Sequence, residues 1–287
     1  MNRMGSLTGA LLDLLNELKE TGIQLIIGGG FGIYLRYQEH LRVPRQTLLK
    51  EWPEPRSTND LDLFLRTELI LDSDRLKLLA EALKRLDYKV IETAKSYQFI
   101  KNSPIGSFKI DILTGPKQVF KDKGLKVDDR RVHPKPSVDL HAHPVDEAIT
   151  LEEQLLLVII EEKKFDGTFL KGEVFLPHPF TFLMMKLFAL RDNIENSEKD
   201  YGRHHALDLY TTIAMMSLQE WESSIDLFRN NRNQQKIVEA RRLVYKLFDN
   251  ENSKGILRLK ENKYYRPEFE IPGFLKALKD LFAEITP

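Results

Sequence analysis

The chain contains no cysteine, so it can form no disulfide and has no thiolate to serve as a nucleophile or metal ligand. It also has no excess charge of either sign, because Lys plus Arg number 43 and Asp plus Glu number 43. This balance argues against a general nucleic-acid coat, although a local basic patch can still bind RNA. No run of about eighteen apolar residues is present, so we expect no membrane span.

The first apolar stretch is also too short and too polar for a secretory signal, since Asp13, Asn16 and Glu17 interrupt or follow it. Together with the absence of cysteine, this predicts a cytoplasmic protein. The chain has 287 residues, of which 42% are hydrophobic and 30% charged. Such a composition is typical of a globular protein with room for two domains.

Two aspartates, Asp60 and Asp62, alternate with leucines in a run that is suited to a β-strand. Side chains i and i+2 of a strand lie on one face, so the carboxylates would be neighbours while the leucines face the core. Neighbouring carboxylates repel each other unless a cation neutralises them, and the pair therefore predicts a Mg²⁺ site. A solvated edge strand is the structural alternative.

A glycine-rich turn over residues 28–32, which begins with Gly28, Gly29 and Gly30, separates the strand-like residues 23–27 from residues 33–37, which have helical character. At such a turn the backbone N–H groups and the helix dipole can face an anion with no Cβ in the way. The pattern is neither a P-loop nor a dinucleotide-binding fingerprint. A tight structural turn is the alternative explanation.

A third acid, Asp111, stands between two isoleucines in the strand-like run 107–115. A lone carboxylate among apolar residues is costly unless it is paired or bound to a metal. A hairpin over residues 97–106 feeds this strand. Three carboxylates beside a glycine turn predict a two-metal nucleotidyl-transfer site, in which Asp60, Asp62 and Asp111 hold two Mg²⁺ ions.

Helical spacing of apolar residues predicts helices over 7–20 and 72–87, and a β-branched run predicts a strand over 89–93. Strand-like runs follow at 155–160 and 173–176. From Pro179 onward the chain is predicted to be mainly helical.

Several stretches together carry a family resemblance: residues 29–35 (GGFGIYL), Arg56, Thr58 and Asp60 to Leu63, then KLFALRD at 186–192, Lys199-Asp200 and ALDLY at 206–210. In these the chain resembles the polymerase-β-type nucleotidyltransferase superfamily. Within it, the chain is most similar to the AbiEii-like proteins, the toxin halves of bacterial toxin–antitoxin systems. The resemblance touches about two thirds of the chain, and residues 36–56 form an insertion relative to it.

The resemblance implies an α+β fold, with a nucleotidyltransferase-type mixed sheet and flanking helices over residues 1–150. A strand-then-helical domain over residues 151–287 would complete the active-site cleft. It also implies Mg²⁺-dependent transfer of a nucleoside monophosphate from a triphosphate to an acceptor hydroxyl. The residues implied in binding the nucleotide are Gly28, Gly29, Gly30, Arg56, Thr58, Lys199, Asp200 and Asp208.

Lys186 is implied as a catalytic residue, whose ammonium would neutralise charge on the leaving group. The structural alternative is a lysine that reaches solvent from an apolar helix. The acceptor implied is tRNA or another RNA, with an antitoxin protein as partner. Arg36, Trp52 and other residues of the insertion offer cations and an aromatic ring for RNA, or form a solvated loop. A small-molecule nucleotidyltransferase of the antibiotic-modifying kind and a noncatalytic nucleotide-binding module are the other hypotheses.

Overall fold

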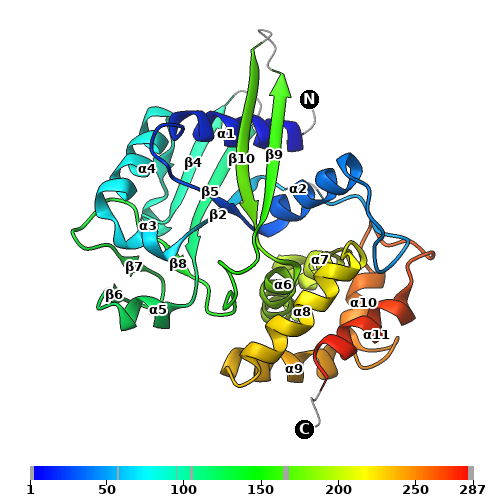
Figure 1. Ribbon diagram of the computed structural model, residues 1–287. Helices are drawn as coiled ribbons and strands as arrows, with labels where there is room; N and C mark the ends of the chain where they lie inside the picture. Colours follow the sequence, from blue (N-terminus) through cyan, green and yellow to red (C-terminus); the bar gives the residue numbers. More distant parts are fainter. Residues whose placement is uncertain (1–2, 57, 95, 104–105, 164–167, 284–287) are drawn as a thin grey trace. The chain divides into compact units, whose positions relative to one another are not determined.

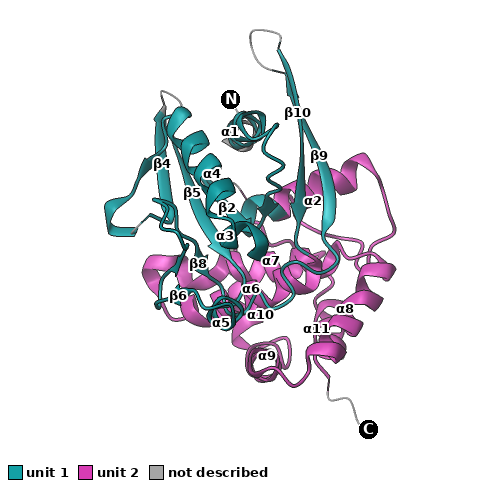
Figure 2. Ribbon diagram, turned by 60° about the vertical axis from the view of Figure 1, so that its left-hand side comes forward, with its two compact units in different colours: residues 1–32, 57–177 teal, residues 33–56, 178–287 magenta. Residues whose placement is uncertain are grey.

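The computed structural model describes residues 3–56, 58–94, 96–103, 106–163 and 168–283. These residues divide into two compact units, coloured in Figure 2. Unit 1 comprises residues 1–32 and 57–177, and unit 2 comprises residues 33–56 and 178–287. No helix in the described ranges is long and apolar enough to cross a membrane.

Unit 1 is built on a mixed sheet, which has eight strands among the described residues. The strand order is β3 (Lys89–Val90), β4 (Gln98–Ser103), β5 (Gly106–Thr114), β2 (Asp60–Leu65), β1 (Ile26–Ile27), β10 (Phe169–Leu176) and β9 (Leu156–Lys163), and β8 (His143–Pro144) also pairs with β5. The pairs β2–β5 and β1–β10 are parallel, whereas β1–β2 and β4–β5 are antiparallel. The predicted α+β class with a mixed sheet is confirmed.

Helices α1 (Arg3–Glu17) and α4 (Ser73–Arg85) cover one face of this sheet (Figure 1). Leucines of α1 pack so closely on β10 that a Cβ on Gly172 would lie 2.7 Å from the side chain of Leu15. Leu61, Leu63, Ile110 and other alternate residues of β2 and β5 are fully buried on this face. The apolar half of each strand is thus committed to the core, which leaves the polar half on the opposite face.

The remaining elements of unit 1 are short. They are α3 (Thr67–Leu71), the 3₁₀ turn η1 (Glu92–Ala94), α5 (Lys117–Asp122) and the two-stranded ladder of β6 (Lys126–Val127) and β7 (Val132–His133). The strand predicted over residues 89–93 stops at Val90, because η1 begins at Glu92. Both predicted helices of the first half form, with bounds shifted by up to four residues at α1 and by one or two at α4.

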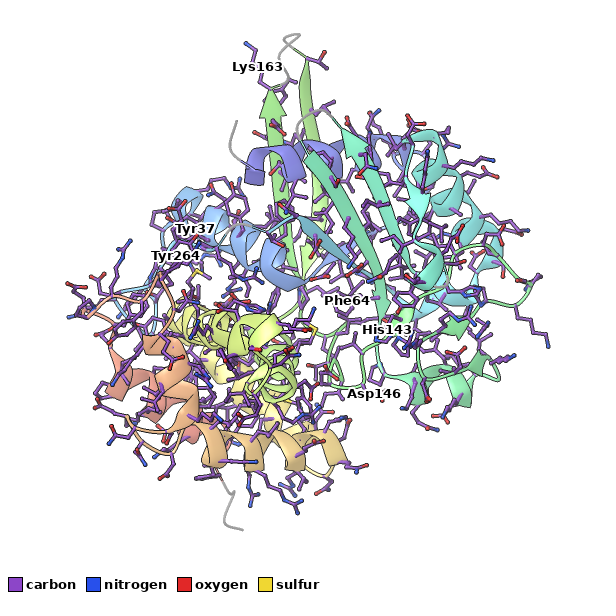
Figure 3. The ribbon with its side chains drawn as sticks, turned by 180° about the vertical axis from the view of Figure 1, so that it is seen from behind. Tyr37, Phe64, His143, Asp146, Lys163 and Tyr264 are labelled. Atoms are coloured by element: carbon purple, nitrogen blue, oxygen red, sulfur yellow. The ribbon has the colours of Figure 1, made fainter. Side chains whose placement is uncertain are left out.

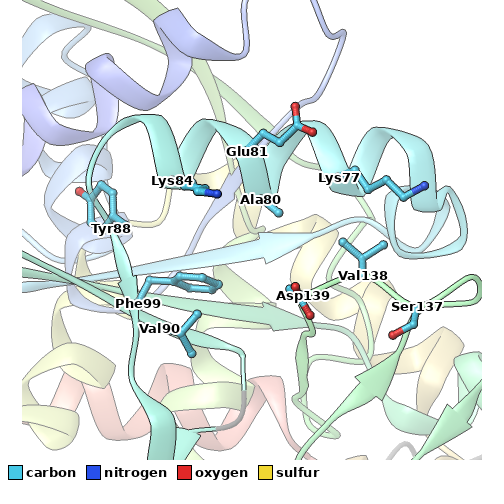
Figure 4. A pocket seen from close by; sticks show the side chains of 10 residues that line it. All are labelled: Lys77, Ala80, Glu81, Lys84, Tyr88, Val90, Phe99, Ser137, Val138 and Asp139. Atoms are coloured by element: carbon cyan, nitrogen blue, oxygen red, sulfur yellow. The ribbon is translucent and has the colours of Figure 1, made fainter.

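A pocket of about 430 Å³ opens between α4 and the β3–β4 edge of the sheet, and Figure 4 shows its lining. Phe99 forms part of it and is paired with Ile110 on β5. Because Ile110 points to the face opposite Asp111, the pocket lies on the helix-covered side of the sheet. It is therefore separate from the face that carries the aspartates.

Unit 2 is mainly helical, as predicted for the second half of the chain. Its elements are α6 (Pro179–Asn193), the 3₁₀ segment η2 (Ser197–Gly202), α7 (Arg203–Ala214), α8 (Leu218–Asn231), α9 (Gln235–Leu247), α10 (Lys254–Lys260) and α11 (Ile271–Leu281). Most side chains of α6 are buried, and this helix packs against α7, α8 and α9. It is the central helix of the unit.

Residues 33–56 belong to unit 2, since they comprise most of α2 (Gly29–Arg42) and a segment that bonds to the helices. Leu48 N donates to Met216 O at 2.8 Å, and Tyr210 Oη donates to Glu51 O at 2.8 Å. Trp52 packs edge-on against Tyr37, with ring centroids 5.4 Å apart. The insertion is therefore packed in part, whereas its residues 41–46 are exposed.

The two units differ from the predicted division at residues 150 and 151. Strands β9 and β10 lie in unit 1 because β10 pairs in parallel with β1, with Phe175 opposite Ile26. The boundary predicted before these strands is therefore found after them, between residues 177 and 178. In addition, residues 33–56 belong to unit 2 and not to unit 1.

Candidate functional site

Strand β2 carries Asp60 and Asp62 on the face of the sheet opposite α1 and α4. Leu61 and Leu63 are fully buried, whereas Asp60 is exposed and Asp62 is half-buried. This burial pattern follows the alternation predicted from the sequence. The strand is interior to the sheet, between β1 and β5, so the alternative of a solvated edge strand does not hold.

The parallel register of β2 and β5 brings the third acid to the same place. Asp62 pairs with Asp111, and Asp60 pairs with Lys109. Paired residues on neighbouring strands project to the same face of a sheet. The structure thus places three aspartates on one face of two adjacent strands.

Asp111 is held by two polar neighbours. The Lys109 ammonium lies 3.0 Å from its carboxylate, and Gln98, which is opposite Asp111 on β4, also donates a hydrogen bond to it. Burial raises the pKa of the Asp111 carboxyl, and the negative charge of Asp60 raises it further. Lys109 and Gln98 lower this pKa, but the effect of burial is larger, so the pKa lies above its usual value. Within the described residues, Asp111 Oδ1 is buried and accepts no hydrogen bond.

The glycine turn lies directly beside Asp62. Gly28 N donates to Asp62 O at 2.9 Å, and α2 begins at the next residue, Gly29. A Cβ on Gly29 would lie 1.6 Å from Asp62 Oδ2, and one on Gly28 would lie 2.4 Å from the ring of Phe64, which is labelled in Figure 3. Only glycine fits at either position. Gly30 is buried in the first turn of the helix.

The Asp62 carboxylate consequently lies at the N-terminus of α2, where the first backbone N–H groups have no acceptor within the helix. This end of a helix favours negative charge. Gly29 has a φ of +61°, a left-handed conformation that a residue with a side chain rarely adopts. Glycine is thus required at position 29 for two separate reasons, the contact with Asp62 and the positive φ.

Across the described ranges, no group of three or more His, Asp and Glu side chains is arranged to hold a metal ion. The predicted cluster of three ligands is therefore not preformed, since Asp111 binds Lys109 and Asp62 lies against Gly29. The donor set itself fits Mg²⁺, which prefers carboxylate oxygens. Asp111 Oδ1 is buried and lies 3.0 Å from the Lys109 ammonium, so this oxygen already stands where positive charge is needed.

A second cluster of charges lies within unit 2. Lys186 of α6 is only 6% exposed, and its ammonium lies 2.7 Å from Asp208 Oδ2 on α7. Arg56 Nε lies 3.8 Å from Oδ1 of the same carboxylate. Burial alone would raise the pKa of Asp208, but the two cations outweigh it and hold this pKa below its usual value.

The burial of Lys186 excludes the alternative of a lysine that reaches solvent from its helix. Two cations share one carboxylate here, so the cluster carries an excess positive charge. Such a cluster can bind an anion. The contact of Lys186 with a triphosphate stays a prediction.

His204 and His205 on α7 interact electrostatically with this ion pair. Their rings are 3.9 Å apart. Burial lowers the pKa of His204 to about 4 and that of His205 to about 2, so both rings are neutral beside the charges of Lys186 and Asp208.

The other predicted site residues lie elsewhere. Asp200 is 60% exposed and pairs with Arg203 at 2.7 Å, while Lys199 is exposed on the preceding turn. Thr58 accepts a hydrogen bond from Asp60 N at 3.3 Å through its Oγ1, which supports the start of β2. Neither Lys199 nor Asp200 forms part of the Lys186–Asp208 ion pair.

Sequence reasoning missed Lys109 and Gln98, which both bind Asp111. Alternation along β5 could have placed Lys109 on the face of Asp111, two residues away. Gln98 could not have been found in this way, because its position opposite Asp111 depends on the register of the β4–β5 hairpin.

Comparisons with known proteins leave the family open. No protein-family model matches the chain, and no curated protein matches it. One similar solved structure is that of the antibiotic-resistance factor ANT(2'')-Ia, described as revealing substrate-regulated conformation dynamics. It is 13% identical with a TM-score of 0.38, over 79% of this chain and 93% of that chain. A likeness of this size assigns neither a family nor an activity.

Proposed function

We propose that the chain is a metal-dependent nucleotidyltransferase, which moves a nucleoside monophosphate from a triphosphate to an acceptor hydroxyl and releases pyrophosphate. The observation that carries the proposal is the position of Asp62. Its carboxylate is opposite Asp111 across the β2–β5 pair and lies against Gly29 at the N-terminus of α2. Carboxylates for a divalent cation and backbone N–H groups for a phosphate thereby meet at one point of unit 1.

In this proposal Asp60, Asp62 and Asp111 hold Mg²⁺, which when bound stabilises the attacking and leaving oxygens of an in-line displacement. The glycine turn binds phosphate oxygens through its backbone N–H groups, as its lack of Cβ atoms allows. Asp111 would also be placed to accept the proton of the attacking hydroxyl.

Replacement of the acids by amides tests the proposal. We expect Asp60→Asn and Asp62→Asn each to lower pyrophosphate release from Mg²⁺-triphosphate by about 10³-fold or more, because an amide holds the cation poorly and neutralises no charge. Asp74→Asn is a matched control, since Asp74 is an exposed acid on α4 that pairs with Lys77 on the surface. Near-normal turnover in either of the first two variants would refute the assignment.

For the acceptor, we infer RNA, tRNA in particular, and a role as the toxin of a toxin–antitoxin pair. This inference depends on the resemblance of residues 186–210 to AbiEii-like proteins. Two residues of the insertion add no support, because Arg36 is fully buried and Trp52 packs against Tyr37, whereas Arg42, Arg45 and Lys50 are exposed. The cations that the sequence offered for RNA are in part used within unit 2.

One experiment separates the acceptors. The protein is incubated with Mg²⁺ and each labelled triphosphate in the presence of total tRNA, a panel of proteins or aminoglycosides. Label on tRNA supports the inference, whereas label on an aminoglycoside indicates a small-molecule nucleotidyltransferase. Binding of triphosphate in calorimetry without any release of pyrophosphate indicates a noncatalytic nucleotide-binding module.

A further inference from the structure

Lys109 lies among the three aspartates, although no role was predicted for it. It stands two residues before Asp111 on β5, and its partner in the parallel register is Asp60. Both positions put its side chain on the carboxylate face. Its ammonium lies 3.0 Å from the Asp111 carboxylate.

The two side chains differ in their freedom to move. Asp111 is 17% exposed and comes from an interior strand, so its carboxylate needs a nearby positive charge. Lys109 is 29% exposed, and its flexible four-carbon stem allows the ammonium to turn to solvent. The ammonium is therefore the partner that can leave this ion pair.

We propose that Lys109 is an internal counter-ion of the carboxylate site, which holds Asp111 while no divalent cation is bound and releases it when one binds. The inference rests on the proposed function, because it takes the three aspartates as metal ligands. It accounts for the absence of a preformed ligand cluster in the described residues, since the ammonium neutralises Asp111 in place of a metal. Lys109 is thus a positioning residue that acts through Asp111.

If the Lys109 ammonium and a metal ion compete for the Asp111 carboxylate, removal of the ammonium should strengthen metal binding. Without the ammonium, the cation no longer has to break an ion pair to reach Asp111. We expect Lys109→Met, which keeps the apolar stem, to lower the Kd for Mn²⁺ about tenfold, equivalent to about 1.4 kcal/mol. Titration calorimetry and the Mn²⁺ electron paramagnetic resonance signal both measure this Kd without any turnover.

Lys171→Met is a matched control for the loss of one positive charge. Lys171 also lies on a strand of the same sheet and pairs with Glu161 at 3.0 Å, but β10 and β9 are at the other end of the strand order. Its Kd for Mn²⁺ should stay within about twofold of the wild-type value, since exposed charges at this separation are largely screened. Lys109→Arg, which keeps the charge, should also stay close to the wild type.

A double-mutant cycle tests whether the effect passes through Asp111. Against an Asp111→Asn background, Lys109→Met should change the Kd by less than about twofold, because the ion pair is already lost. Thermal melts establish that each variant folds, and Lys109→Gln replaces Lys109→Met if the latter does not.

The outcomes separate the inference from the proposed function. Tighter binding in Lys109→Met that disappears in the Asp111→Asn background supports the inference. Mn²⁺ binding that requires Asp62 but is unchanged or weakened in Lys109→Met overturns the inference and leaves the metal site standing. Wild-type protein that binds no Mn²⁺, or binds it equally well after Asp62→Asn, overturns both.

Discussion

Gly29 offers a sharp test of the carboxylate site, because the structure provides a second glycine as its control. Gly29 has a φ of +61°, and a Cβ there would lie 1.6 Å from Asp62 Oδ2. Gly22 has a φ of +67°, and a Cβ there would meet nothing within 4 Å. The two positions share a backbone conformation and differ in their surroundings, so alanine at each separates the backbone cost from the displacement of Asp62.

The magnitudes follow from these two facts. A left-handed conformation costs a residue with a side chain roughly 1–2 kcal/mol, so Gly22→Ala should lower the free energy of unfolding by about that amount and leave activity unchanged. Gly29→Ala carries the same cost and also forces the Asp62 carboxylate to move by about 2 Å, from 1.6 Å to an ordinary contact distance of about 3.5 Å. A misplacement of about 1 Å at a reacting centre can lower the rate about 100-fold, which is the loss expected for Gly29→Ala.

Urea unfolding measures the first quantity and pyrophosphate release the second. The double variant Gly29→Ala with Asp62→Ala isolates the clash, since the nearest Asp62 atom that remains would be its Cβ, 3.2 Å away. It should lose no more stability from the glycine change than Gly22→Ala does. If Gly29→Ala released pyrophosphate as fast as Gly22→Ala, the position of Asp62 against the glycine turn would not contribute to catalysis.

Two further predictions concern stability in unit 2. Arg36→Met should lower the free energy of unfolding by about 3 kcal/mol in urea, because the fully buried guanidinium is 2.6 Å from Glu220 Oε2 and its loss leaves this largely buried carboxylate with only the Ser217 N–H bond to compensate its charge. The same change at exposed Arg42 should cost no more than about 1 kcal/mol, and equal losses would contradict the argument. Burial lowers the pKa of His178 to about 4, so between about pH 6.5 and 4 the unfolded chain binds a proton at His178 that the folded chain does not. As the pH falls through this window, His178 should contribute a loss of about 3 kcal/mol of stability, in addition to any loss from the buried His204 and His205. His178→Asn keeps an acceptor that can cap α6 but does not titrate, so an unreduced pH dependence in this variant would show that His178 is not the cause.

Local patterns were sufficient to predict the face that bears the acids. Alternation in β2 separated Asp60 and Asp62 from the leucines, and alternation in β5 did the same for Asp111. These predictions succeeded because a strand with one buried face repeats every two residues, whatever its neighbours are. The glycine turn was visible for a similar reason, since three glycines between a strand and a helix mark a close backbone approach.

The division into units could not be predicted, because it depends on contacts between residues far apart in the chain. Strand β10 joins the first unit through its pairing with β1, some 150 residues earlier. Residues 33–56 join the second through the Arg36–Glu220 ion pair and the bond from Leu48 N to Met216 O. Neither contact leaves a periodic signal in the sequence.

The sequence predicted three aspartates grouped around a metal ion, whereas the structure shows Asp111 paired with Lys109. This difference has an electrostatic cause. Alternation places side chains on a face but does not decide which cation neutralises them. Asp111 requires a positive charge because it is largely buried, and an ammonium two residues away on the same strand supplies it without any ligand. A protein that keeps three aspartates on one face must either bind a metal tightly enough to fold around it or carry its own counter-ion. On the proposal made above, the Lys109–Asp111 pair is the second solution, in which the ammonium neutralises Asp111 until a divalent cation displaces it.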